Sequence, residues 1–146
     1  MTTVEKNKLI ADFMNTEVHI FQWNDKQSLV LGSKEDFNFR YMQHYEPEKD
    51  WNDLIPVVEK IESLGCIVEI SFSLGTVCKI CQVIPTINFV SEDNIPIKAV
   101  YDTIVEFIQY FNLNKESNVE TSSTKTSQIS SKSRNTNLSP GETDWC

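Results

Sequence analysis

Apolar residues recur at helical spacing in three segments of the chain. Residues 4–14 and 96–112 each carry one apolar face, and residues 50–64 carry the clearest one. The apolar stripe of this middle segment consists of Leu54, Val57, Val58, Ile61 and Leu64. The pattern therefore predicts a short first helix, a middle helix and a closing helix.

The middle helix has recognisable ends. Asp50 is a candidate N-cap, and Gly65 is the residue at which the helix is expected to stop. Pro56 lies within the apolar stripe. Because proline has no amide hydrogen to donate, it predicts that this helix either begins late or bends after its first turn.

The remaining apolar segments alternate with a period of two, which predicts strands. The expected strands are residues 17–23, 28–31, 66–73, 76–84 and 87–90, with a further short strand through Phe37, Phe39 and Tyr41. Asn24 and Asp25 form the expected turn between the first two. The order helix, strands, helix, strands, helix predicts an α+β domain, with helices packed on one face of a small, mostly antiparallel sheet.

Composition changes sharply near residue 112. Half of residues 115–146 are Ser, Thr or Asn, and large apolar residues are rare there. Such a segment cannot bury enough surface to offset the entropy lost on ordering. We therefore expect a single domain over residues 1–112 and a disordered tail over residues 113–146.

The chain of 146 residues is acidic, with 21 acidic and 13 basic residues and a net charge of −8. The whole net charge lies in residues 1–112, which hold 17 acidic and 9 basic residues. Proteins that hold nucleic acid need clustered Lys and Arg. The only arginines of this chain are Arg40 and Arg134, and its basic residues form no run. Direct binding of nucleic acid is therefore not expected.

Membrane insertion and export are not expected either. The longest apolar runs are much shorter than the ~20 residues of a spanning helix, and the first eight residues lack a signal-peptide pattern. We expect the protein in the cytoplasm, where its four cysteines would be reduced thiols.

Cys78 and Cys81 form a CxxC motif inside a strand pattern. Such a motif can serve redox exchange or one half of a zinc site, with Cys66 and then His19 or His44 as further ligands. The favoured interpretation is that these thiols are small apolar residues of a hairpin, because a strand directs residues three apart to opposite faces. No cofactor and no catalytic residue is predicted, and Cys66, Cys78 and Cys81 remain weak metal candidates.

The densest acidic segment surrounds the start of the middle helix. It combines carboxylates with two aromatic residues, which is typical of a protein-contact surface. The predicted binding residues are Tyr45, Glu46, Glu48, Asp50, Trp51 and Asp53. The alternative interpretation is that Trp51 packs at the helix start and that the carboxylates are simply solvated.

Three segments resemble small proteins of Bacteroidetes phages and prophages. They are "NKLIADFM" (7–14), "WNDLIPVVEKIESLGCIVEI" (51–70) and "IKAVYDTIVEFIQYFN" (97–112). The resemblance implies a phage or mobile-element origin and a small intracellular accessory protein, and it brings no activity or catalytic residue with it. Those proteins often show Asp-Trp after the first Trp, where this chain has Asn52 and Asp53.

The sequence therefore predicts a non-enzymatic accessory protein of phage type that acts by binding a host or phage protein. Inhibition of a host factor is one concrete version. The alternative is a small-ligand-binding protein with a pocket between sheet and helices, lined by Trp23, Phe37, Phe39 and Tyr41. The sequence does not indicate the oligomeric state.

Overall fold

The computed structural model describes residues 1–83 and 85–122, with side chains to residue 117. The helices are α1 (Thr3–Met14), α2 (Trp51–Ser63) and α3 (Pro96–Ser122), and the short 3-10 turn η1 spans Phe39–Tyr41. The strands are β1 (Val18–Trp23), β2 (Lys26–Leu31), β3 (Ile67–Phe72), β4 (Thr76–Gln82) and β5 (Ile87–Asp93). The predicted α+β class is confirmed.

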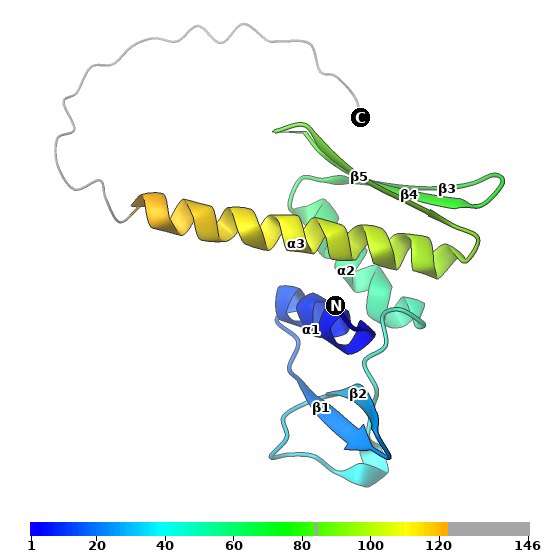
Figure 1. Cartoon of the computed structure of the whole chain (residues 1–146), viewed down its shortest axis with the longest axis vertical. Coiled ribbons are helices and arrows are strands. Elements are labelled where there is room, and N and C mark those ends of the chain that lie inside the picture. The colour runs from blue at the N-terminus through cyan, green and yellow to red at the C-terminus, as the bar shows by residue number, and fades with distance from the viewer. Residues whose placement is uncertain (84, 123–146) are drawn as a thin grey trace, which may run out of the picture.

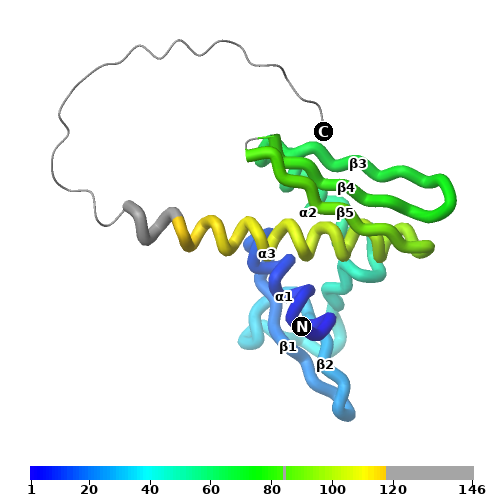
Figure 2. The backbone as a smooth tube through the Cα atoms, turned by 45° about the horizontal axis from the view of Figure 1, so that its top comes forward, coloured from blue at the N-terminus to red at the C-terminus, as the bar shows by residue number. Residues whose placement is uncertain are grey.

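The strands form two antiparallel sheets rather than the single sheet expected from sequence. β1 pairs with β2, and β3, β4 and β5 form the second sheet in that order. The far edge of β2 is already occupied, because the Leu31 amide donates to the Gln43 carbonyl and the Tyr45 amide donates to the Leu29 carbonyl, both at 2.9 Å. The β1–β2 hairpin therefore stands apart from the larger sheet and projects from the helices (Figures 1 and 2).

The hairpin turn is the one that its sequence predicts. Asn24 and Asp25 have φ of 46° and 62°, the left-handed values that a two-residue type I′ turn requires. Asn and Asp tolerate this conformation better than other residues with side chains. The turn sets the register that pairs Trp23 with Lys26.

α2 begins at Trp51, so the late start, one of the two outcomes that Pro56 suggests, does not occur. The Asp50 side chain accepts from the Asn52 amide at 2.9 Å, which confirms the N-cap. Pro56 lies inside the helix, and its cost is one missing hydrogen bond to the carbonyl four residues before it. Gly65 follows the helix with φ of +86°, as expected for the residue that ends it.

α3 is the central element. The β3–β5 sheet lies on one side of it and α1 on the other (Figures 1 and 2). Its buried residues cover more than one stripe for that reason: Ala99, Val100, Tyr101, Thr103, Ile104, Val105, Phe107 and Ile108. The Thr103 hydroxyl is satisfied by the Ala99 carbonyl at 2.8 Å, so a polar residue is accommodated within this core.

α3 continues to Ser122, ten residues past the predicted domain boundary at residue 112. Eight of residues 113–122 are polar or charged, a composition that is compatible with a tail. The helical backbone nevertheless extends through them. The rest of the predicted tail, residues 123–146, lies outside the described residues.

The predicted strand through Phe37, Phe39 and Tyr41 is also wrong. Residues 39–41 form η1, and the side chain of Asn38 caps it by accepting from the Arg40 amide at 3.0 Å. The aromatic alternation in this segment reflects packing against the hairpin and not strand pairing. None of the described helices combines the length and apolar character that a membrane span requires.

Candidate functional site

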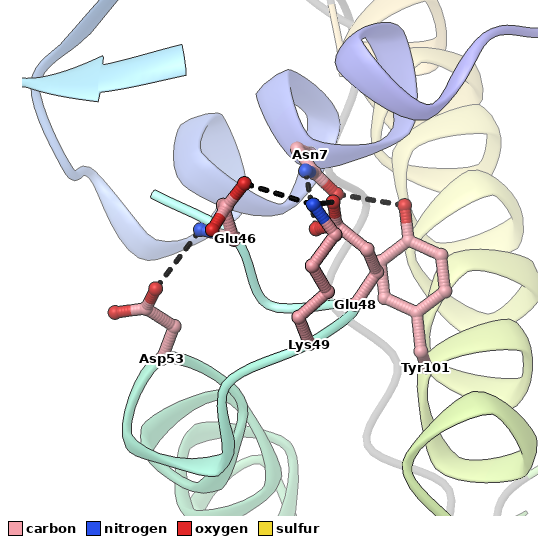
Figure 3. A network of polar contacts seen from close by, with 6 residues as sticks. All are labelled: Asn7, Glu46, Glu48, Lys49, Asp53 and Tyr101. Carbon is pink, nitrogen blue, oxygen red and sulfur yellow. Dashed lines mark hydrogen bonds and ion pairs between the residues drawn. The ribbon is translucent and has the colours of Figure 1, made fainter. Parts of the chain in front are cut away.

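The predicted acidic binding segment is divided between the interior and the surface. Tyr45 is buried, and its amide extends the pairing of β2. Glu48 is half-buried and points toward α1 and α3 (Figure 3). These two residues are part of the internal structure and are not free to meet a partner.

A chain of hydrogen bonds passes through Glu48 and joins three elements (Figure 3). The Tyr101 hydroxyl of α3 donates to Asn7 Oδ1 of α1 at 2.7 Å. Asn7 Nδ2 in turn donates to a Glu48 carboxylate oxygen at 2.6 Å. Asn7 is 4% exposed, so this network crosses the core between residues 94 positions apart in the chain.

The neighbouring carboxylates are also engaged locally. Asp53 accepts from the Glu46 amide at 2.9 Å, which joins α2 to the preceding loop. Burial raises the pKa of Asp53, with the nearby Asp50 and Glu46 carboxylates adding to the shift. Lys49 donates to Glu46 at 3.0 Å and lies 4.0 Å from Glu48, so it balances part of the local charge (Figure 3).

Of the six predicted binding residues, only Asp50 and Trp51 are exposed. Trp51 is 37% exposed, and Ile55 lies one turn later on the same helix with 42% exposure. Glu59 and Glu62 are exposed further along α2. The outer face of α2 is therefore a small apolar patch bordered by acidic residues.

The predicted ligand-pocket residues do not lie between a sheet and the helices. Three of them, Trp23, Phe37 and Phe39, join two further rings of β1 on one face of the hairpin. The rings contact in series with centroids 5.0 to 6.2 Å apart, in the order His19, Phe37, Phe21, Phe39 and Trp23. Phe37 and Tyr41 border a hollow of about 110 Å³. Sites for drug-sized ligands occupy roughly 300–1,000 Å³, so this hollow is too small for one.

The last two rings of this series, and Tyr41 two residues beyond Phe39, are exposed to solvent. Trp23, Phe39 and Tyr41 are 62%, 60% and 83% exposed, and Arg40 is exposed between the last two. We call these three aromatic residues the aromatic ridge. The sequence contains a signal for this group of rings, because alternation in β1 places His19, Phe21 and Trp23 on one face. The wrong prediction of a strand at residues 37–41 is the reason that the contact of Phe37 and Phe39 with this face was not expected.

Larger hollows exist elsewhere. One of about 440 Å³ lies beside the later turns of α3 and is lined by Pro85, Tyr110, Phe111 and Asn114, among others. Another of about 320 Å³ lies over Asn7, Ser28, Tyr45 and Glu48. In the second hollow, Asn7 is already bonded to Glu48 and Lys49 to Glu46, so these four polar side chains are engaged with one another.

Two of the cysteines, Cys66 and Cys78, are buried in the way that the interpretation as small apolar residues predicts. Cys66 and Cys78 are buried free thiols, and burial raises the pKa of both, which disfavours the reactive thiolate. Cys81 is also buried, and alternation directs it to the face of β4 opposite Cys78. It is disulfide-bonded, so the expectation of a reduced thiol is wrong for this residue. Among the described residues, no three His, Cys, Asp or Glu side chains lie close enough together to hold a metal ion.

The buried tyrosines predict a loss of stability in alkali. Burial raises the pKa of Tyr45 to about 12, with Asp53 adding to the shift, and burial also raises the pKa of Tyr101. An unfolded tyrosine ionises near pH ~10. Because the folded state favours the neutral hydroxyls, their contribution is fully present below pH ~10 and is lost as pH rises through about 12.

The free energy of unfolding in urea, determined at a series of increasing pH values, measures this effect. The ultraviolet absorbance of tyrosinate at the same pH values reports the ionisation of the tyrosines. The Tyr45→Phe variant is the control, since it removes one of the two groups and should reduce the loss. A free energy of unfolding that stays constant between pH ~10 and pH ~12 would contradict the assignment.

In comparisons with known proteins, no family model, no curated protein and no solved structure matches this chain, so the proposal on function rests on the surfaces described above.

Proposed function

We propose that this protein acts by binding another protein, without catalysis, and that the aromatic ridge is its main contact surface. The observation that carries the proposal is the exposure of Trp23 at the end of the projecting hairpin (Figure 1) together with Phe39 and Tyr41 on η1, which packs on the hairpin through Phe39. Single exposed apolar residues are ordinary, but several of them on neighbouring elements are typical of an interaction site.

The composition of the ridge supports protein binding in particular. Trp, Tyr and Arg dominate the energetic centres of protein interfaces, and Trp23, Arg40 and Tyr41 supply all three types. Two of the three rings are also held in advance, because Trp23 packs on Phe39 and Phe39 packs on Phe21. Less side-chain entropy is then lost when a partner binds.

Charge supports a partner whose contacting surface carries positive groups. The net charge of −8 and the acidic outer face of α2, with Asp50, Glu59 and Glu62, would attract such a partner during diffusion. The resemblance of three segments to phage and prophage proteins favours a bacterial host or phage partner in the cytoplasm. Inhibition of a host factor is the specific role that we propose on this basis.

The experiment compares capture of proteins from a bacterial host lysate by the immobilised chain and by two matched double variants. Trp23→Ala with Tyr41→Ala removes the ridge, while Phe72→Ala with Leu74→Ala removes two equally exposed apolar residues from the other sheet, at 69% and 98% exposure. A hot-spot truncation costs about 2 kcal/mol or more, which is roughly a 30-fold loss of affinity.

We expect one or more proteins captured by the wild type to be lost with the ridge variant and retained with the control variant. Circular dichroism checks that both variants are folded. Equal capture by the ridge variant and the wild type would overturn the ridge as the contact surface. Equal loss with both variants would indicate adsorption to apolar side chains in general and would also overturn it.

A further inference from the structure

β1 is an open sheet edge. It pairs with β2 on one side, and in the described part of the chain no strand pairs with it on the other. Its six residues, Val18–Trp23, include no Lys, Arg, Asp, Glu or Pro. Exposed edges are usually protected by charges, prolines or bulges, because their unpaired backbone groups invite another strand.

The two edges of the other sheet are protected in this way. β3 carries Glu69, and β5 carries Glu92 and Asp93. A strand added to either would bring its own side chains beside these carboxylates. Among the described strand edges, β1 is therefore the one without a charge to oppose pairing.

The hydrogen-bond pattern identifies the backbone groups at this edge. The Leu29 carbonyl and the Leu31 amide bond to residues 45 and 43, so they point away from β1. Their cross-strand partners are Ile20 and Val18. Since bonding direction alternates along an antiparallel strand, the amides and carbonyls of Val18, Ile20 and Gln22 point outward from the hairpin.

The charge distribution makes the hairpin the region where two copies can approach. Residues 18–43 hold three acidic and three basic residues, so they carry no net charge. The remaining part of residues 1–112 therefore carries the full −8. The hairpin also projects from the helices, which keeps the acidic bodies of two copies apart (Figures 1 and 2).

We propose that a second copy of this chain pairs with β1, antiparallel, about a two-fold axis at Ile20. In this register Ile20 faces Ile20 of the other copy, and Val18 faces Gln22 in both directions, so each outward backbone group finds a partner. An uncharged strand suits this contact because identical residues meet at the axis. Both aromatic faces then lie on the same side of one continuous sheet.

Sedimentation of the full chain under reducing conditions tests this dimer. The wild type is expected at twice 16.8 kDa at micromolar concentrations. Ile20→Pro removes an outward amide that the single copy does not use, so it should sediment at 16.8 kDa with an unchanged circular dichroism spectrum. Ile20→Val keeps that amide and should remain dimeric.

A second variant covers the case in which the proline variant does not fold. Ile20 is 49% exposed, so Ile20→Lys is tolerated by one copy but places two like charges opposite each other at the axis. It should also be monomeric. Hydrogen exchange provides an independent signature, because the amides of Val18, Ile20 and Gln22 should be protected in the wild type and exposed in this variant.

A wild type that remains at 16.8 kDa up to about 100 micromolar would overturn the proposal, as would a dimer that persists in the Pro or Lys variant. The proposal does not depend on the proposed function, since the assay contains only this chain. The Ile20 variants leave the residues of the aromatic ridge unchanged. Failure of the dimer proposal is therefore distinguishable from failure of the protein-binding proposal.

Discussion

A Leu54→Asp variant is expected to be unfolded. Leu54 is fully buried on α2 and lies in a core that includes Ile10, Val57 and Ile61. A carboxylate there loses its hydration without gaining a partner, at a cost of several kcal/mol. The whole domain has only about 5–15 kcal/mol of stability to lose. Far-ultraviolet circular dichroism and thermal melting measure the result.

The matched control is Ile55→Asp, the same class of change at the next position of the same helix. Ile55 is 42% exposed, so its carboxylate stays hydrated and should cost no more than about 1 kcal/mol. The contrast separates burial from helix propensity, which is equal in the two variants. A folded Leu54→Asp protein with an unchanged melting transition would show that this stripe does not face the core.

The helices were predictable because each is specified by local signals. Four residues of the predicted α2 stripe are buried or partly buried, whereas the fifth, Leu64, is 47% exposed. The helix begins and ends where Asp50 and Gly65 place it. Pro56 does not delay the start of the helix, because burial of Leu54 and Val57 outweighs the loss of one backbone hydrogen bond. In most of this helix the local sequence pattern and the burial of side chains favour the same structure, and only at Pro56 do they oppose each other.

The site was less predictable because it depends on contacts between distant segments. Asn7 and Tyr101 are far apart in the chain, and no local pattern marks either as a partner of Glu48. Glu48 and Tyr45 were therefore assigned to a binding surface, although they face inward. Composition identifies an acidic and aromatic segment, but only the packed fold decides which of its side chains remain outside.

The Asn7→Ala variant is expected to lose about 2–3 kcal/mol of stability, because it removes one hydrogen-bond partner from the buried Tyr101 hydroxyl and one from the half-buried Glu48 carboxylate. The Tyr101 hydroxyl loses its acceptor and Glu48 loses a donor, while alanine itself favours the helix. For a chain of this size the melting temperature should fall by roughly 5–10 °C. Urea unfolding measures the free energy directly.

Asn114→Ala is the control, since this exposed asparagine donates only to a carbonyl of its own helix and should cost nothing measurable. Tyr101→Phe removes the other side of the bond and leaves Asn7 Oδ1 unpaired. The double variant should therefore cost less than the sum of the two single ones, because each single variant already exposes the same broken contact. Strict additivity, or an Asn7→Ala protein within about 0.5 kcal/mol of wild type, would mean that the network does not hold α1 against α3.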